Sequence, residues 1–158
     1  MRSKKAPKRI LAPDPIYNSR LLHRFINKVM KDGKKDLAQR LVYLALDQIK
    51  KAKGEDVLKV FEQAVSNVSP KMEVRPRRVG GASYQVPAEV RGDRREALAI
   101  RWIIEGAKSR PNKEFHHFYE KLAAELQDAS QNTGWAIKKK DDMQKVAAAN
   151  RAFAHFRW

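Results

Sequence analysis

Arginine and lysine are the residues of this chain best suited to do chemistry, because they outnumber the acidic residues 34 to 18 and give a net charge of +16. Their cationic groups bind phosphate oxygens, and an excess of this size is typical of nucleic-acid binding, although a merely basic soluble protein is an alternative. The candidate phosphate-binding residues fall in short clusters: Arg2, Lys4, Lys5, Lys8, Arg9, Lys28, Lys34, Lys35, Arg75, Arg77, Arg78, Arg91, Arg94 and Arg95. Cations spread over several elements suit a folded RNA better than a single groove.

The acids, histidines and glycines form no catalytic or metal-binding pattern. The chain has no cysteine, and the neighbouring His116 and His117 point about 100° apart on a helix, so they cannot share one metal ion. Glu55 and Asp56 suit a helix start, where acids stabilise the helix dipole. The sequence has no nucleophile elbow, Walker loop or dinucleotide-binding fingerprint. We therefore predict that the chain is not an enzyme and binds no metal ion or cofactor.

One stretch, residues 72–90, indicates β-structure, and Gly80-Gly81 supplies the positive φ angles of a tight turn. Pairing positions whose numbers sum to 162 separates apolar from polar side chains, so we expect a hairpin loop of three or five residues. In this register Pro76 and Pro87 lie in neighbouring pairs, one of which must be a hydrogen-bonded pair. Because proline has no N–H, one ladder hydrogen bond would be lost unless a bulge interrupted the pairing. In this register Arg75 and Arg77 share a polar face that continues to Arg91–Arg95.

Helical periodicity covers most of the remaining chain. We expect six helices. The first runs from Asn18 or Ser19 to Gly33, the second from after Lys35 to Gly54 with Leu37 and Leu44 on its apolar stripe, and the third from Glu55 to Pro70. The fourth begins with the capping box of Asp93 and Glu96 and ends at Pro111, the fifth begins at Phe115, and the sixth runs through Ile137 and Val146. The predicted fold class is mainly α: a single-domain bundle of about six helices, residues 1–158, with one protruding two-stranded hairpin.

Both ends of the chain have their own character. Residues 1–12 are basic and free of acids, which predicts a tail that stays disordered until a polyanion orders it, and residues 149–158 form a C-terminal extension. No apolar run approaches the roughly 20 residues of a membrane span, and the N-terminus lacks the apolar region of a secretory signal. These features favour a location in the cytoplasm or inside an organelle.

Several motifs resemble the bacterial-type small-subunit ribosomal protein seven family, and the resemblance extends along nearly the whole chain. The motifs are Pro13-Asp14-Pro15 with Tyr17, then Gly33-Lys34-Lys35, Arg77-Arg78-Val79-Gly80-Gly81, Tyr84-Gln85-Val86-Pro87, Arg91–Arg95 and the C-terminal run ANRAFAHFRW. The chain departs from the family at Phe156, where tyrosine is usual, and at Trp135, Gln144 and Ala148.

The resemblance implies a structural constituent of the small ribosomal subunit that nucleates folding of the 3′ major (head) domain of its rRNA and acts in translation. It also implies a hairpin and a C-terminal helix beside the exit-site tRNA and the outgoing mRNA, with ribosomal proteins nine and eleven as neighbours. The residues expected near tRNA or mRNA are Val79, Gly80, Gly81, Ala82, Ser83, Tyr84, Lys138, Lys139, Lys140, Phe153, Phe156, Arg157 and Trp158. We expect a cytoplasmic or organellar ribosomal location, no membrane partner and no homo-oligomer.

A DNA-bending protein that uses its hairpin as a minor-groove arm is the alternative function from another class. Such arms carry an apolar wedge at the tip, often proline. Here the tip is Gly80-Gly81-Ala82, which is too small to separate stacked bases, and the prolines lie further back in the strands. Preference for duplex DNA over folded rRNA would discriminate the two functions.

Overall fold

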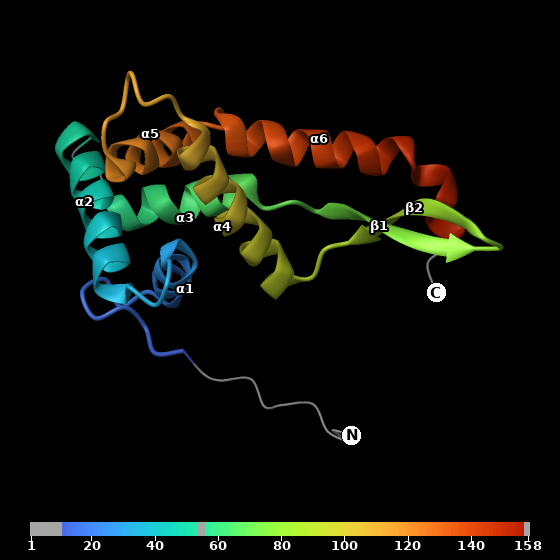
Figure 1. Cartoon of the computed structure of the whole chain (residues 1–158), viewed down its shortest axis with the longest axis horizontal. Coiled ribbons are helices and arrows are strands. Elements are labelled where there is room, and N and C mark those ends of the chain that lie inside the picture. The colour runs from blue at the N-terminus through green and yellow to red at the C-terminus, as the bar shows by residue number, and fades with distance from the viewer. Residues whose placement is uncertain (1–10, 54–55, 157–158) are drawn as a thin grey trace.

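The structure, a computed structural model, describes residues 11–53 and 56–156, and this part of the chain is mainly helical with one two-stranded antiparallel sheet (Figure 1). The elements are α1 (Arg20–Val29), α2 (Lys35–Lys53), α3 (Val57–Val68), β1 (Met72–Val79), β2 (Ala82–Glu89), α4 (Gly92–Ser109), α5 (Phe118–Ser130), α6 (Trp135–Ala149) and the 3-10 helix η1 (Arg151–Phe156). The predicted mainly-α class with one hairpin is confirmed. Within the described residues, no helix is both long and apolar enough to cross a membrane.

The core of the helical body forms where the apolar faces of the first five α-helices meet. Helix α5 packs against α2, α3 and α4, and α1 packs against α2 and α4. The rings of Phe25 and Phe61 meet edge to face with their centroids 5.3 Å apart, and both side chains are fully buried. Burial of each such side chain stabilises the folded state by about 1.5–3 kcal/mol. The many buried side chains of this body therefore give the hairpin a stable base.

Two helix boundaries differ from those predicted. Helix α1 ends at Val29 and not at Gly33, because Met30 has left the helical conformation and the chain turns through Asp32 and Gly33 at positive φ. Helix α5 begins at Phe118 and not at Phe115, because a Glu120 carboxylate oxygen accepts the His117 backbone N–H at 3.0 Å. That hydrogen bond satisfies one of the unpaired donors of the helix start.

The predicted capping box of Asp93 and Glu96 is wrong. Helix α4 begins at Gly92, and its N-cap residue Arg91 makes no side-chain capping hydrogen bond. Glu96 instead accepts a hydrogen bond from Arg24 of α1, and an Asp93 carboxylate oxygen lies 3.5 Å from the same guanidinium. The guanidinium of Arg24, from a neighbouring helix, therefore pairs with the two carboxylates that the sequence pattern assigned to a local helix cap.

Leu37 and Leu44 were also wrongly placed in the core. Both lie on α2, and they are 51% and 43% exposed. The helix buries Ala38, Val42, Ala45, Leu46 and Ile49, which is a narrower stripe than its run of apolar residues suggests. A single stripe of this width is enough for packing against α5, and it leaves Leu37 and Leu44 largely in solvent.

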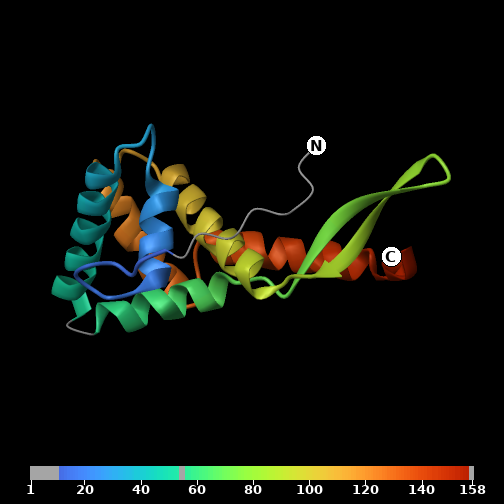
Figure 2. The same ribbon diagram turned by 90° about the horizontal axis from the view of Figure 1, so that it is seen from below.

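The hairpin has a two-residue loop, so the predicted register is wrong by one position. Val79 pairs with Ala82 and Arg75 with Val86, so paired positions sum to 161. Gly80 and Gly81 have φ angles of +56° and +88°, as a type I′ hairpin turn requires at both central positions. The turn sets the register because the hairpin projects from the body and has no single buried face to impose another one (Figure 2).

The observed register also removes the difficulty with the prolines. The Val90 N–H donates to the Lys71 carbonyl at 3.0 Å, so odd-numbered positions of β1 form the hydrogen-bonded pairs. Pro76 and Pro87 then both fall in non-hydrogen-bonded pairs, where a missing N–H costs nothing. The bulge invoked in the sequence analysis is not needed.

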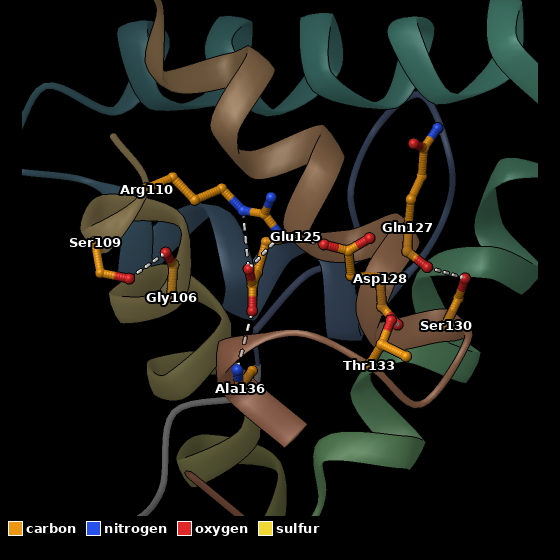
Figure 3. Close-up of polar contacts among 9 residues, drawn as sticks. All are labelled: Gly106, Ser109, Arg110, Glu125, Gln127, Asp128, Ser130, Thr133 and Ala136. Carbon is orange, nitrogen blue, oxygen red and sulfur yellow. Dashed lines mark hydrogen bonds and ion pairs between the residues drawn. The ribbon is translucent and has the colours of Figure 1, made fainter. Parts of the chain in front are cut away.

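A buried carboxylate joins the helical body to α6 (Figure 3). Glu125 of α5 is 1% exposed and accepts hydrogen bonds from the Nε and Nη2 of Arg110 at 3.0 and 2.7 Å. Its other oxygen accepts the backbone N–H of Ala136 at 2.9 Å, in the first turn of α6. Glu125 therefore caps α6 from another helix, and the carboxylate is compensated on both sides.

The Glu125 side chain fits only because Gly106 faces it across the α4–α5 contact. A Cβ at Gly106 would lie 2.6 Å from the Glu125 Oε1 atom, well inside van der Waals contact. The same carboxylate fixes the start of α6, and α6 leaves the body and runs toward the hairpin, where η1 and the described C-terminus lie beside β2 (Figure 1). The position of the hairpin is therefore coupled to the core through α6.

Candidate nucleic-acid interface

Four of the predicted phosphate-binding arginines come together where the hairpin meets α4. They line one hollow of about 560 Å³ together with three residues of β2, and the lining residues are Arg75, Arg77, Val86, Ala88, Glu89, Arg91 and Arg94. Arg75 and Arg77 reach the same face because they are two positions apart on β1. Gly92 starts α4 directly after the hairpin, which places Arg91 and Arg94 at its foot.

Glu73 holds two of these arginines in place. Its side chain is buried, with the residue 3% exposed, and it accepts hydrogen bonds from the Nε of Arg94 at 2.7 and 3.0 Å. The guanidinium of Arg75 donates to the same carboxylate. Both arginine side chains remain about half exposed, so they can still contact a ligand while Glu73 fixes their orientation.

The pKa of the Glu73 carboxyl reflects two opposing effects. Burial alone would raise this pKa, but hydrogen bonds and charge from Arg94 and Arg75 outweigh burial and hold it below its ordinary value of 4.5. Glu73 therefore stays ionised at neutral pH. The carboxylate is part of the interface as a fixed counter-charge.

Replacing Glu73 by glutamine should lower the free energy of unfolding by about 1–2 kcal/mol at neutral pH, because charge-assisted hydrogen bonds are lost. A lowered folded-state pKa stabilises the protein above the unfolded-state pKa, and this stabilisation disappears as the pH falls through the lower, folded-state pKa. The gap in melting temperature between the native chain and Glu73→Gln should therefore be constant near neutral pH and shrink below pH 4.5. Circular dichroism melts across acidic pH test this, and a gap independent of pH would contradict it.

Two further arginines of this region, Arg78 near the hairpin tip and Arg95 on α4, do not line the hollow. Arg78 is exposed and pairs with Ser83, which puts it on the opposite face of the hairpin from Arg77. Arg95 is half buried, and its Nε is the one buried side-chain polar atom in the described residues without a hydrogen-bond partner. An unpaired buried donor of this kind is costly, and its burial keeps it away from a ligand in solvent.

The remaining cations of the body lie on separate surfaces. Lys28 lines a hollow of about 240 Å³ between α1 and α4 with Arg24 and Arg101. Lys34 lines another, of about 220 Å³, at the junction of α1, α2, α4 and α5. Lys35 is exposed at the first position of α2. These residues do not line the arginine hollow, so their expected contacts with a folded polyanion stay a prediction.

An aromatic cluster attaches the hairpin to the end of the chain. The ring centroid of Tyr84 lies 5.2 Å from those of both Phe153 and Phe156, and the His155 ring lies 4.1 Å from Phe156. We call Tyr84, Phe153 and Phe156 the aromatic clasp. These three rings, which the resemblance places near tRNA or mRNA, contact each other, and the hairpin tip from Val79 to Ser83 extends beyond them (Figure 2).

Replacing both Phe153 and Phe156 by alanine should loosen the hairpin without melting the body, because these rings contribute to the clasp and not to the buried core. We expect backbone amides of β1 and β2 to exchange with solvent about tenfold faster, since each aromatic pair contributes about 0.5–1.5 kcal/mol. Hydrogen exchange read by mass spectrometry tests this, with Trp135→Ala on the exposed start of α6 as the control. Unchanged hairpin exchange would show that the clasp is unimportant.

The three lysines of α6 differ in their surroundings. Lys138 and Lys139 are exposed, and the Lys139 ammonium lies 5.9 Å from the Trp135 ring centroid. Lys140 donates to the Asn67 carbonyl at 3.0 Å, which ties α6 to α3. Lys138 and Lys139 are therefore better placed than Lys140 to contact a partner. The tail residues Arg2, Lys4, Lys5, Lys8 and Arg9, and the C-terminal Arg157 and Trp158, lie outside the described residues.

Sequence reasoning missed two kinds of residue in this interface. It did not identify Glu73 as the group that orients Arg75 and Arg94; a single acid in the basic segment from Lys71 to Arg78 was the available signal. It also did not link Arg101 to Lys28 across the α1–α4 hollow. In the described residues, no group of three or more acids and histidines could hold a metal ion.

Comparison with known proteins gives the family. The ribosomal protein S7p/S5e family matches residues 1–151. Small ribosomal subunit protein uS7 of Thermoanaerobacter pseudethanolicus is 56% identical over 151 residues, which cover 96% of this chain and 95% of the relative. The uS7 proteins of Streptococcus suis and Thermomicrobium roseum are 54% and 55% identical over 157 residues and cover 99% of each chain. The chain therefore belongs to the ribosomal protein S7p/S5e family.

Proposed function

We propose that this chain, a structural protein of the small ribosomal subunit and not an enzyme, nucleates folding of the 3′ major domain of the small-subunit rRNA in the cytoplasm. The observation that supports this most strongly is the single hollow lined by Arg75, Arg77, Arg91 and Arg94. A compact set of guanidinium groups suits phosphates that a folded RNA brings close together.

The mechanism is electrostatic. RNA strands that converge at a junction repel each other, and cations fixed on a rigid body lower the free energy of the folded junction relative to open forms. Because the protein binds the folded RNA better, it shifts the folding equilibrium by its differential affinity. The arginine cluster, Lys28 and Lys34 lie on different elements, so one protein can hold several strands at once.

The hairpin tip and the C-terminal end have a second role in this proposal, next to the exit-site tRNA and the outgoing mRNA. The tip projects from the body and is made of small residues, Val79–Ser83, which suits close approach without strong binding (Figure 2). Lys138 and Lys139 offer exposed charge on α6, the helix that runs toward the hairpin. Ribosomal proteins nine and eleven are the proposed protein neighbours.

A competition assay tests this function against the DNA-bending alternative. The full chain is bound to a labelled 3′ major-domain rRNA fragment, and unlabelled fragment or duplex DNA is added as competitor. We expect the rRNA fragment to compete at least a hundredfold better than duplex DNA, within the usual range of specific over non-specific binding. Equal competition by duplex DNA would contradict the proposed function.

A further inference from the structure

The hollow at the foot of the hairpin differs from a flat basic patch in both shape and floor. It is a concave space of about 560 Å³, within the range of sites that enclose one small ligand. Its floor includes Val86, which is 2% exposed, and the half-buried Ala88. The apolar floor exists because the two-residue turn pairs Val86 with Arg75 and Ala88 with Glu73.

Arginines surround this floor, and two of them are fixed before any ligand arrives. Arg75 and Arg94 are hydrogen-bonded to the buried Glu73, whereas Arg77 and Arg91 are exposed on the rim. Guanidinium groups can donate to phosphate oxygens and can also stack on the flat face of a base. Groups that are already oriented lose less conformational entropy on binding, so Glu73 acts as a positioning residue.

This combination matches one class of ligand. A paired RNA helix keeps its bases stacked inside and shows phosphates on a convex surface, so it can touch the rim but cannot enter the hollow. An unpaired nucleotide offers a flat apolar base together with its phosphates, and sequence-specific RNA recognition mostly targets such nucleotides. From this fit, and resting on the proposed rRNA-binding function, we propose that the hollow binds a single unpaired nucleotide of the RNA. Its base lies on Ala88, above the nearly buried Val86, and its phosphates contact the surrounding arginines.

The test compares two RNA probes: a continuous duplex, and the same duplex with one unpaired adenosine inserted. The native full chain should bind the second probe about tenfold more tightly, because the unpaired base buries apolar surface in the hollow and can stack on a guanidinium plane. Ala88→Leu fills the hollow without changing charge, so it should abolish the tenfold difference in affinity between the two probes. Ala88→Val, a smaller filling that suits a strand, should reduce the preference partially.

Glu73→Gln tests the positioning role separately. It releases Arg75 and Arg94 and adds one positive charge, so the ratio of the affinities for the two probes should fall from about tenfold toward one, although the added charge favours binding of any RNA. Glu105→Gln on the exposed face of α4 is the charge-matched control and should keep the preference.

The inference is overturned if the native chain binds both probes equally, or if Ala88→Leu keeps the tenfold preference with an unchanged circular dichroism melt. Affinity for the 3′ major-domain fragment is measured in parallel. Tight binding of that fragment without any preference between the probes refutes the nucleotide site alone. Failure to bind the fragment refutes the proposed function instead.

Discussion

Replacing Arg77, Arg91 and Arg94 together by alanine will lower the affinity for the 3′ major-domain rRNA by about a hundredfold at about 0.15 M salt, because up to three charge-assisted phosphate contacts are lost. All three side chains line the same hollow, and Glu73 keeps Arg75 as its partner in the variant. The plot of log affinity against log salt should also become shallower, by roughly 0.7–0.9 for each contact removed. Filter binding over a salt series measures both quantities.

The matched control removes the same charge from another surface. Arg40, Lys50 and Lys51 are exposed residues of α2 and do not line the arginine cluster. Their triple alanine variant lowers the net charge equally, so a general polyanion effect would weaken both variants alike. We expect the α2 variant to bind within about threefold of the native chain. Equal losses in the two variants would refute a localised site.

Replacing Glu125 by alanine will destabilise the whole fold by about 3–4 kcal/mol, because Arg110 keeps only Asp128 as a carboxylate partner and the Ala136 N–H loses its acceptor. Native domains are stable by only about 5–15 kcal/mol, so this is a large fraction of the total. For a chain of this length we expect the melting temperature to fall by about 10 °C or more. Thermal and urea unfolding followed by circular dichroism measure the change.

Two further variants separate the causes of this loss. Glu125→Gln keeps an oxygen that can accept the Ala136 N–H but removes the charge that faces Arg110, so it should cost less than alanine. Gly106→Ala places a Cβ 2.6 Å from the Glu125 Oε1 atom and should destabilise by steric overlap alone. Glu62→Ala, on an exposed face of α3, should change stability by no more than about 0.5 kcal/mol. A Glu125→Ala chain as stable as Glu62→Ala would refute the proposed role of the carboxylate.

The arginine cluster could be predicted from sequence even though the hairpin register could not. Arg75 and Arg77 share a face in any register, because side chains alternate along a strand and these two are two positions apart. The register decides only which residues of β2 join them. Apolar patterning suggested polar neighbours, whereas the positive φ angles of Gly80 and Gly81 set a pairing that brings Val86 and Ala88 instead. Local turn geometry overrides patterning in a hairpin that no core covers.

Contacts between distant parts of the chain account for most of what sequence reasoning missed. A glycine is required at position 106 because the carboxylate of Glu125, 19 positions away in the sequence, lies where a Cβ would be. Arg24 and Glu96 are 72 positions apart, so the local capping pattern at Glu96 was misleading. Helical periodicity predicts which face is buried but not which charged groups meet across two faces.

Chemical footprinting of the isolated 3′ major-domain rRNA, with and without the full chain, is the measurement that tests the central claim most directly. If the chain nucleates folding of this domain, then protections should appear at converging strands of a junction when only this protein is added. The same protections should weaken strongly with the Arg77, Arg91 and Arg94 triple variant and persist with the α2 control. Absence of protection in this domain, or identical protections with the triple variant, would contradict the account.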